Sequence, residues 1–540
     1  MRAYISLILL ICIVLTQFCS TGNDKTQDTQ NDASNEVNNT NLNNALNDNN
    51  NFENNENNND NISSVTTQED VLSLITGATY HVDPVVGDDE NAGTEEAPFK
   101  SIGKVLSVVQ SGDGVILGDG NHGDFIDLDN KRGDGWVVFI AEEGANPFFT
   151  KIEISYEEPD NAYLIFYGID VTVEWVDPDG GNTGADDPYY ADSDQNTYEK
   201  TEDAIRLNSV NNFRFYKGKI TGTNENLTKL GIWMETVENI IIEKNEISAI
   251  QIPIQLWYAS NVYIRNNHIH GFVSSCIRYG DFNRNIYIEQ NHCHDMNWDV
   301  SEPYTPRLPG TNYHNSVIAL YTGDVTIRNN IFHDGFTSSG IMFYDNMGNV
   351  FHNVIIENNL MYDIQTAVLR LNNAGENIII RNNTIVGYFR EHSMGRYNYY
   401  TTLNVHSLGE EFDGSDIKIY NNIFAGGVFF YEGYDTIQQG NNIFWSLQNL
   451  EAGEWITNAT VKNNSKVITW DATFPDYFAA GFFSEDPDFA FAHHKTLDFT
   501  LSTTAEAINF GDPTEQPSDS LGTLDENGFV QSNGRVRDES

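Results

Sequence analysis

VYIRNNHI, at residues 262–269, is one copy of a short string that recurs along the chain. Each copy alternates apolar residues, continues with a polar pair that ends in Asn, and then returns to an apolar residue. The further copies are IIIEKNEI at 240–247, IYIEQNHC at 286–293, VTIRNNIF at 325–332, VIIENNLM at 354–361, IIIRNNTI at 378–385, IKIYNNIF at 417–424 and the weaker IQQGNNIF at 437–444. Alternation rich in Ile and Val predicts a short β-strand. The polar pair predicts a bend, because Asn tolerates left-handed backbone and bonds to neighbouring main chain.

The second Asn of each pair sets a regular spacing. Successive positions lie 22, 24, 39, 29, 24, 39 and 20 residues apart, at Asn245, Asn267, Asn291, Asn330, Asn359, Asn383, Asn422 and Asn442. A basic period of 22–24 residues with two long insertions suits one turn of a parallel β-helix. One turn cannot bury its own apolar face, so stacking supplies the core and lets identical Asn side chains bond along the axis. No amphipathic helical stretch separates the strings, which argues against a TIM barrel.

Composition excludes several classes of protein. The 540 residues include 29 Lys and Arg against 78 Asp and Glu, which gives a net charge of −49. Proteins that bind nucleic acid or anionic membranes need a basic face, so neither partner is expected. Four Cys exclude a disulfide scaffold and a Cys-rich zinc module. We also expect a monomer.

The N-terminus predicts export. Arg2 precedes an apolar run over 5–18 that is too short to cross a bilayer comfortably and is typical of a secretory signal. Cys19 ends the run, and the small polar residues after it make residues 1–19 resemble a bacterial lipoprotein signal. That resemblance implies a lipid on Cys19 that anchors the protein to the cell surface or outer membrane, as its only membrane contact. The alternative is an ordinary signal that is cleaved nearby and yields a secreted protein.

The rest of the chain divides into three parts. Residues 20–66 predict a disordered tether, because 23–62 hold 18 Asn and few apolar groups that a core would need. Residues 67–445 are expected to form the β-helix with its N-terminal cap, and 446–540 its C-terminal coils and closing segment.

Two end segments resemble a known family. TYHVDPVVGDDENAGTEEAPFKSIGKVLSVVQSGDGVILGDGNHGDF, at 79–125, resembles the opening of pectate-lyase-like right-handed parallel β-helix proteins. DPDFAFAHHKTLDFTLSTTAEAINFG, at 486–511, resembles the closing segment of many extracellular β-helix proteins. The resemblance implies an all-β, single-stranded right-handed parallel β-helix with a capping helix at about Ile102–Gln110. It also implies an extracellular polysaccharide lyase type, although this fold carries lyases, hydrolases, epimerases, esterases and binders alike.

A second strand is expected between successive strings, and it presents an outer face. Its inward positions are apolar pairs such as Ile277 and Tyr279, and the period of two turns the residues between and after them outward. We call these outward residues the stripe: Arg206, Trp233, Gln255, Arg278, Ala319, Met342, Arg370 and Asn404 between the pairs, and Asn208, Glu235, Trp257, Gly280, Tyr321, Tyr344, Asn372 and His406 after them. Aromatic faces stack on sugar rings, and Arg matches carboxylates or sulfates. The stripe therefore predicts a groove for a linear polysaccharide, and the alternative is a face covered by loops.

Two insertions are expected to border the stripe. They are DMNWDVSEPYTPRLPGTNYHN at 295–315 and YFREHSMGRYNYYTT at 388–402, and each precedes a stripe strand. Long loops on a rigid scaffold commonly carry function. They supply the candidate residues Arg307, Tyr313, His314, His392 and Arg396.

The first functional hypothesis is a lyase, or the mechanistically close C5-epimerase, that acts on an anionic uronate polymer of the alginate or pectate type. Such a reaction needs a cation to neutralise the carboxylate, for which Arg278 and Arg370 are candidates, and a base near C5. His314 or Tyr313 is the preferred base and Lys229 a further one, with Tyr321, Tyr344 or His392 as acid. Substrate contacts are expected from Arg206, Trp233, Gln255, Trp257, Lys229, Arg307, His392, Arg396 and His406.

Two alternatives stay open. A glycoside hydrolase needs two carboxylates about 5–10 Å apart, and the stripe offers only Glu235, with Asp345 and Glu391 beside it. A non-catalytic carbohydrate-binding surface protein or adhesin would use the same stripe.

An acidic insertion predicts calcium binding. DPDGGNTGADDPYYADSDQ, at 177–195, offers the oxygen ligands Asp177, Asp179, Asn182 and Asp187 with Gly for the turn. The insertion lacks the bidentate Glu of an EF-hand, so an ordinary acidic loop is the alternative. Bound Ca²⁺ would help an acidic protein to hold an anionic polymer.

Further positions repeat from coil to coil. His270, His294 and His333 each follow an aligned Asn by three residues, and Tyr362 continues the column. Imidazoles stacked about 5 Å apart offer a transition-metal site, but polar turn filler is the preferred interpretation. Cys276 and Cys293 fall in neighbouring strands and either pair after export or remain buried thiols.

Overall fold

The computed structural model describes residues 67–129, 132–173, 203–222, 228–272, 274–296, 316–335, 339–344, 349–364, 367–387, 401–430, 436–447, 466–470, 523–524 and 530–531. The chain divides into two units, Met1–Val65 and Thr66–Ser540, and every described residue belongs to the second. The predicted signal, tether and lipidated Cys19 lie outside the described residues. The predicted domain limits therefore stay predictions.

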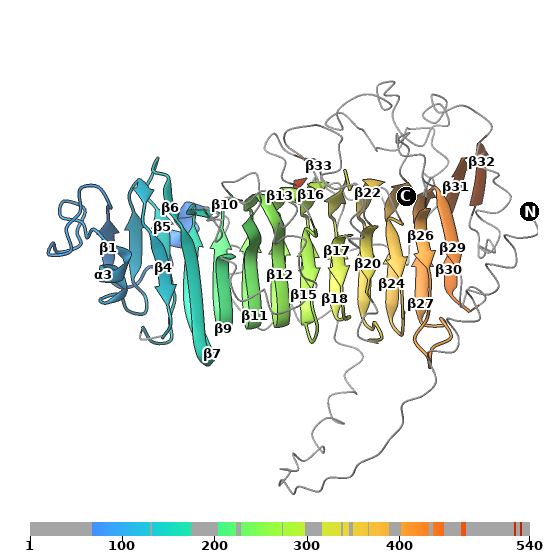
Figure 1. Ribbon diagram of the computed structural model, residues 1–540, viewed down its shortest axis with the longest axis horizontal. Coiled ribbons are helices and arrows are strands. Elements are labelled where there is room, and N and C mark those ends of the chain that lie inside the picture. The colour runs from blue at the N-terminus through green and yellow to red at the C-terminus, as the bar shows by residue number, and fades with distance from the viewer. Residues whose placement is uncertain are drawn as a thin grey trace, which may run out of the picture. The chain divides into compact units, whose positions relative to one another are not determined.

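Strands β1 to β32 form one hydrogen-bonded sheet that winds into stacked coils (Figure 1). Each coil contributes to three columns of parallel strands. This arrangement confirms the predicted all-β, single-stranded right-handed parallel β-helix.

The string column contains the strands of the recurring string and the N-terminal strands that are stacked in line with them. Its members are β1 (Thr79–Val82), β2 (Gly114–Leu117), β5 (Val137–Ala141), β15 (Arg284–Glu289), β18 (Val325–Arg328), β21 (Val354–Glu357), β24 (Ile378–Arg381), β27 (Ile417–Tyr420) and β30 (Gln438–Gly440). Each pairs in parallel with the matching strand of the next coil.

The turn column follows each Asn pair and was not separately predicted. It contains β3 (Gly120–Asn121), β6 (Pro147–Phe149), β8 (Asp170–Val173), β10 (Lys219–Gly222), β13 (His268–Phe272), β16 (His292–Met296), β19 (Ile331–Phe332), β22 (Leu360–Ile364), β25 (Thr384–Gly387), β28 (Ile423–Ala425), β31 (Ile443–Leu447) and β32 (Lys466–Trp470).

The stripe column carries the predicted outer face. It contains β4 (Asp124–Asp127), β14 (Ile277–Tyr279), β17 (Ser316–Leu320), β20 (Ser339–Phe343), β23 (Leu369–Leu371), β26 (Thr401–Val405) and β29 (Gly427–Phe430). Four long strands pass through more than one column: β7 (Lys151–Tyr167), β9 (Asp203–Tyr216), β11 (Thr228–Glu243) and β12 (Glu246–Arg265).

One apolar core runs through the coils. The inward pairs of the stripe column are fully buried, as the period of two predicts. Phe125, Phe139 and Phe166 fill the N-terminal coils with ring centroids 5.0–5.2 Å apart. In the later coils Ile and Val pack together with further buried aromatic residues, among them Phe332, Phe343 and Phe430.

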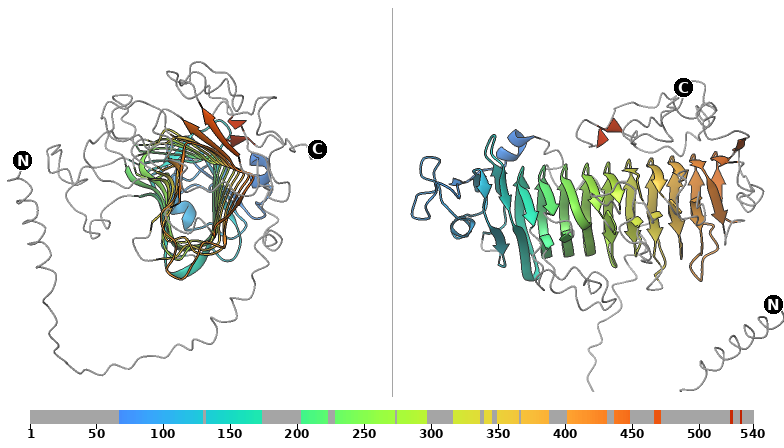
Figure 2. Two further views of the ribbon diagram at one scale, coloured as in Figure 1. Left: turned by 90° about the vertical axis from the view of Figure 1, so that its right-hand side faces the viewer. Right: turned by 45° about the horizontal axis from the view of Figure 1, so that its top comes forward.

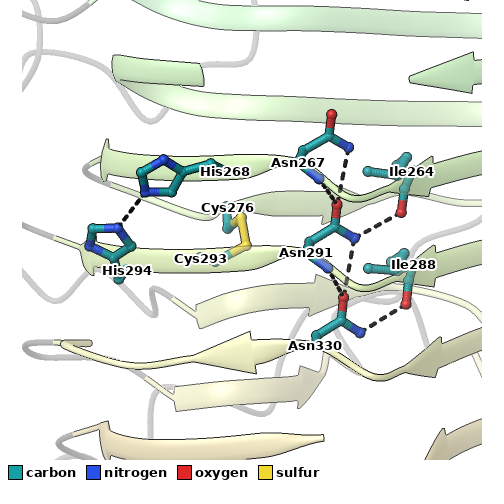
Figure 3. Close-up of a disulfide and its surroundings, with 9 residues drawn as sticks. All are labelled: Ile264, Asn267, His268, Cys276, Ile288, Asn291, Cys293, His294 and Asn330. Atoms are coloured by element: carbon teal, nitrogen blue, oxygen red, sulfur yellow. Dashed lines mark hydrogen bonds between the residues drawn. A yellow bond between two sulfur atoms is a disulfide. The ribbon is translucent and has the colours of Figure 1, made fainter. Parts of the chain in front are cut away.

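The aligned Asn residues form a continuous buried ladder. Asn267 donates from Nδ2 to Asn291 Oδ1 at 3.0 Å, and Asn291 donates from Nδ2 to the carbonyl of Ile264 at 2.8 Å (Figure 3). The same side-chain bond links every neighbouring pair from Asn245 to Asn442. The residue before each aligned Asn has a positive φ, between 51° and 59°, which confirms the predicted left-handed bend.

A short helix caps the N-terminal end of the stack. Helix α3 (Ile102–Leu106) begins after Ser101, whose side chain accepts a hydrogen bond from the Lys104 amide, and buries Ile102 and Val105 in the core. It lies within the outline of the coils when viewed along the stack (Figure 2, left). The helix ends at Leu106, not at the predicted Gln110, because Ser107 closes the last turn with its amide on the Lys104 and Val105 carbonyls.

The remaining elements are small. Helix α2 (Gln68–Leu72) has a capping box between Thr67 and Asp70, and β33 (Thr523–Leu524) pairs antiparallel with β34 (Val530–Gln531). The described part of the chain holds no helix long and apolar enough to span a bilayer. Cys276 and Cys293 form a disulfide between neighbouring coils (Figure 3).

Candidate functional site

The stripe residues pair in register from coil to coil. The backbone pairing runs through Arg206, Trp233, Gln255, Arg278, Ala319, Met342, Arg370 and Asn404 in that order. Glu235 pairs with Asn208 on one side and with Trp257 on the other. The predicted outer column therefore exists as one continuous face, whose role remains a prediction.

The middle of this face brings two aromatic rings together between two arginines. Tyr321 and Tyr344 stack with centroids 5.1 Å apart and an interplanar angle of 12°. Ala319 and Met342 pack with them in a separate apolar cluster outside the main core. Because Arg278 pairs with Ala319 and Met342 pairs with Arg370, the cluster forms a floor with one guanidinium at each end. Three strand spacings separate those two backbones, about 14 Å.

Tyr344 lies at the centre of this group. Its side chain is 6% exposed, and the Ser316 hydroxyl lies 3.3 Å from its phenolic oxygen. Burial raises the pKa of Tyr344 to about 12, and the neighbouring Tyr321 adds to the rise, while Ser316, Arg278 and Arg370 oppose it. Tyr344 is therefore a neutral phenol at physiological pH. It is able to donate a proton and is not poised to accept one.

The two arginines have only part of their donors engaged within the described structure. Arg278 donates from Nη2 to Ser274 Oγ at 3.1 Å, and Arg370 donates from Nε to Asn372 Oδ1 at 3.2 Å. Arg278 Nε is buried and has no hydrogen-bond partner among the described residues. Both side chains are partly exposed, so each retains N–H groups that can reach a ligand anion.

Aromatic surface continues toward the N-terminal coils. Trp257 lies 6.0 Å from Tyr321, centroid to centroid, although one coil separates them. Gly280 occupies that intervening position, and an added Cβ there would approach Trp257 to 2.2 Å. The missing side chain therefore lets the indole lie across the strand and join the Tyr321–Tyr344 stack.

A second polar group lies further along the same face. Arg206 donates from Nε to Asp203 Oδ2 at 2.8 Å and lies 5.5 Å from the Trp233 ring. Asp203 is 2% exposed, and burial raises its pKa to about 6, against the opposing charge of Arg206. Glu153, which pairs with Arg206 on the neighbouring strand, forms an ion pair with Lys151 at 2.7 Å.

Several predicted substrate contacts differ in exposure. Gln255 is 3% exposed, and its Oε1 has no partner among the described residues, so it lines the floor and is not a projecting side chain. His406 is exposed, and Trp233 and Trp257 are partly exposed. Lys229 lies in β11.

The loop candidates lie outside the described residues. These are Arg307, Tyr313, His314, His392 and Arg396, together with the predicted calcium ligands Asp177, Asp179, Asn182 and Asp187. Within the described ranges, the one group of three or more side chains that could hold a metal is His268, His292 and His294.

Sequence reasoning missed three residues that contact the stripe, namely Ser274, Ser316 and Asp203. Ser274 and Ser316 contact Arg278 and Tyr344, but single serines near strand starts carry no distinctive signal. Asp203 could have been recognised from the sequence. It precedes the inward-facing Ile205 by two residues, so its side chain points to the same side of the strand.

No protein-family model matches the chain, and no curated protein matches it. Solved structures similar to it include pectate lyase Pel9A, with 13% identity, a TM-score of 0.37 and coverage of 82% of this chain and 94% of that one. XylC in complex with xylose has 15% identity, a TM-score of 0.35 and coverage of 73% and 86%. The lacto-N-biosidase of Eubacterium ramulus has 13% identity, a TM-score of 0.37 and coverage of 73% and 67%. Likenesses this remote carry no argument about the reaction.

Proposed function

We propose that the protein is an exported, polysaccharide-active β-helix protein whose stripe binds an anionic uronate polymer and cleaves it by β-elimination. The observation that carries this proposal is the group of Arg278, Tyr321, Tyr344 and Arg370 on one outer face. Carbohydrate rings stack on aromatic side chains, and guanidinium groups pair with carboxylates. The floor between the two arginines suits an oligosaccharide segment, so each arginine meets the carboxylate of a different sugar.

The chemistry follows from the protonation state of this group. A base removes the proton from C5 of the uronate, the C4–O bond breaks, and a double bond forms between C4 and C5. The leaving oxygen takes a proton from an acid, and Tyr344 suits that role because it stays neutral to a pH of about 12. Arg278 or Arg370 neutralises the carboxylate and the negative charge that develops as the proton leaves. We assign the base to His314 or Tyr313.

Calcium and export complete the proposal. We propose that Asp177, Asp179, Asn182 and Asp187 bind Ca²⁺, because the net charge of −49 repels an anionic polymer and a bound cation offsets that repulsion. We also propose a monomer that is anchored outside the cell through a lipid on Cys19. This part rests on the charged start, the short apolar run and the Cys that ends it.

The test is an assay for the unsaturated product. Alginate, pectate and chondroitin are incubated with the protein and calcium, and the ultraviolet absorbance of the unsaturated uronate is followed. We expect a rise with at least one polymer, a slower rise after chelation, and a loss of about 100-fold in Tyr344→Phe. Tyr287→Phe is the matched control, because Tyr287 also stacks on a tyrosine, Tyr263, but lies in the string column. No rise with any uronate polymer overturns the lyase proposal.

A hydrolase is the second candidate, and Asp203 is the observation that favours it. A carboxyl group with a pKa of about 6 is suited to general acid catalysis, and Glu153 offers a second carboxylate on the neighbouring strand. Asp203 faces the core side of its strand and is bonded to Arg206, which counts against direct contact with a substrate. Release of reducing ends without the unsaturated product, abolished by Asp203→Asn, would favour the hydrolase.

A further inference from the structure

Five histidines from three consecutive coils gather in the turn column, away from the stripe. His268 pairs in register with His292, and His270 pairs with His294. His333 continues the column, with its ring stacked on that of His294 at 5.0 Å. Sequence spacing predicted His270, His294 and His333, but it overlooked His268 and His292 two residues before the first two.

The ring nitrogens of these residues point at one another across the coils. His268 Nε2 lies 2.8 Å from His294 Nε2 (Figure 3), and His292 Nε2 lies 2.7 Å from His333 Nε2. On the opposite edges of two rings, His294 Nδ1 lies 2.9 Å from Asp295 Oδ2 and His333 Nδ1 lies 2.8 Å from Asp334 Oδ2.

These contacts fix where the ring lone pairs point. An ionised carboxylate only accepts hydrogen bonds, so Nδ1 of His294 and of His333 carries the proton. In the neutral ring, Nε2 of each then carries a lone pair that faces another imidazole. A carboxylate on one nitrogen and a directed lone pair on the other is the arrangement that orients histidine ligands in metal sites.

We propose that His268, His292 and His294 bind a divalent transition-metal ion of the zinc type, oriented by Asp295. One ligand nitrogen from each of the three rings lies within 4.8 Å of the other two. Zinc–nitrogen bonds of about 2.0–2.1 Å in a tetrahedron place ligand nitrogens about 3.3 Å apart. The His268 and His294 rings therefore need to part by about half an ångström, and the proton between the two facing nitrogens must move from Nε2 to Nδ1 of His268, so that both Nε2 atoms present lone pairs.

The surroundings favour an ion of this class over the alternatives. Imidazole nitrogen suits Zn²⁺, Cu²⁺ and Ni²⁺, whereas Ca²⁺ requires oxygen ligands. His292 is 4% exposed, while His268 and His294 are partly exposed, so an ion can enter from solvent and reach a buried ligand. The neighbouring Asn267–Asn291 bond and the disulfide at Cys293 hold the two coils in register.

From the sequence, the preferred interpretation was that these histidines are polar residues that only fill the turns. That interpretation explains fewer of the observed contacts. Stacked rings alone account for the column, which continues from His333 to Tyr362 at 4.7 Å. Stacking does not require a carboxylate on the far nitrogen of His294, nor two histidines per turn in neighbouring coils.

The experiment uses the untagged full-length protein after treatment with a chelator. Co²⁺ is titrated in and followed by its visible absorption, and Zn²⁺ is titrated by calorimetry. We expect one ion per chain and a cobalt spectrum typical of nitrogen ligands in a tetrahedral site. His268→Phe keeps the ring stack but removes one ligand, so the affinity should fall at least about tenfold.

His270→Phe is the matched control. It lies in the same turn and stacks on His294 at 5.4 Å, but it is outside the ligand group. This variant should keep one ion per chain with little change in affinity. Circular dichroism and the unfolding midpoint establish that each variant is folded, and His294→Gln replaces His268→Phe if that variant fails to fold. Absence of stoichiometric binding to the unaltered protein, or equal titrations of the two Phe variants, overturns the proposal.

Discussion

At the scale of single residues, the aligned Asn positions carry the architecture. From Asn267 to Asn422, each is buried and uses its side chain to bond the Asn of the next coil and a carbonyl of the preceding string. The residue before it takes the left-handed conformation, in which Asn is less strained than other side chains with a Cβ. In six of the eight strings this residue is also Asn, and in the other two it is Lys244 or Gln290, so the first residue of the pair shapes the bend and the second joins the coils.

Asn359→Ala tests the ladder. The change removes the bonds to Asn383 and to the Ile327 carbonyl, and it takes away the Asn359 Oδ1 acceptor from the Asn330 amide and from the Asn330 side chain, which keeps its bond to the Ile288 carbonyl. We expect the free energy of unfolding to fall by about 3 kcal/mol, because buried polar groups lose their partners. Equilibrium denaturation measures the change.

Asn121→Ala is the control for this substitution, because Asn121 is exposed and accepts a single bond from the Gly123 amide. It should cost less than about 1 kcal/mol. Equal losses for the two variants would show that the ladder adds nothing special to stability.

Asp203 gives a second prediction at this scale. Its pKa rises from 3.8 to about 6 in the folded protein, so between these values the folded chain binds a proton that the unfolded chain does not. The free energy of unfolding therefore falls as pH rises through this window, by an amount on the order of 3 kcal/mol. Asp203→Asn removes this contribution, and its stability relative to the unaltered protein should improve between pH 4 and pH 7.

Denaturation at several pH values makes that comparison. Glu238→Gln, at an exposed position, controls for the loss of one negative charge and should keep the original profile. If Asp203→Asn and the unaltered protein give parallel profiles, the buried carboxyl is not protonated as described.

The residue-scale result also marks how far sequence reasoning reaches. Period two predicts which side of a strand Gln255 occupies, but not that its neighbours bury it. The pKa of Tyr344 depends on Ser316 and two arginines from other coils, so no local pattern contains it. The repeat spacing predicts the column of His270 and His294. It does not predict His268, because it aligns only one position in each turn.

At the scale of elements, the string column carries alternating charges. The residue before each polar pair reads Glu243, Arg265, Glu289, Arg328, Glu357 and Arg381 in successive coils. Ion pairs join Arg265 to Glu243, Arg328 to Glu289 and Arg381 to Glu357, at 2.6–3.0 Å between nitrogen and oxygen. Opposite charges on neighbouring strands stabilise one register and oppose a slip by one coil.

Arg328→Glu tests this alternation. It places three carboxylates in a row with Glu289 and Glu357, and like charges on neighbouring strands repel. We expect a loss of about 1–2 kcal/mol in the free energy of unfolding, partly restored by high salt. Arg328→Met, which removes the pair without adding repulsion, should lose less and respond less to salt. Equal salt responses in the two variants would contradict the account.

The elements also show why the fold was predictable and the site was not. The strings repeat the same bend and the same inward residues, so stacking follows from the chain alone. The stripe depends on non-repeating positions, such as Gly280 beneath Trp257, whose effect appears only when coils are adjacent. The loop candidates His314 and Tyr313 have no repeat that would position them.

At the scale of the whole molecule, the net charge of −49 opposes an anionic ligand while the stripe attracts it. The two effects differ in range, because salt screens distant charges and leaves close ion pairs less affected. We expect uronate polymer to bind more tightly as sodium chloride rises to about 0.1 M, where the Debye length is about 10 Å. A basic groove would show the opposite trend.

Affinity electrophoresis across a range of salt concentrations makes this measurement, with a neutral polymer as the control. Binding that weakens steadily from the lowest salt concentration would show that the long-range field favours the polymer and would contradict this view of the surface.

The central claim is that Arg278 and Arg370 act together on one polysaccharide chain across the Tyr321–Tyr344 floor. The direct test compares retardation of Arg278→Met/Arg370→Met in gels that contain a uronate polymer with that of Arg284→Met/Lys418→Met, which removes two cations from the string column. We predict that the stripe variant loses retardation and that the string-column variant keeps it. Equal retardation of both variants, with the unaltered protein retarded, would contradict the claim.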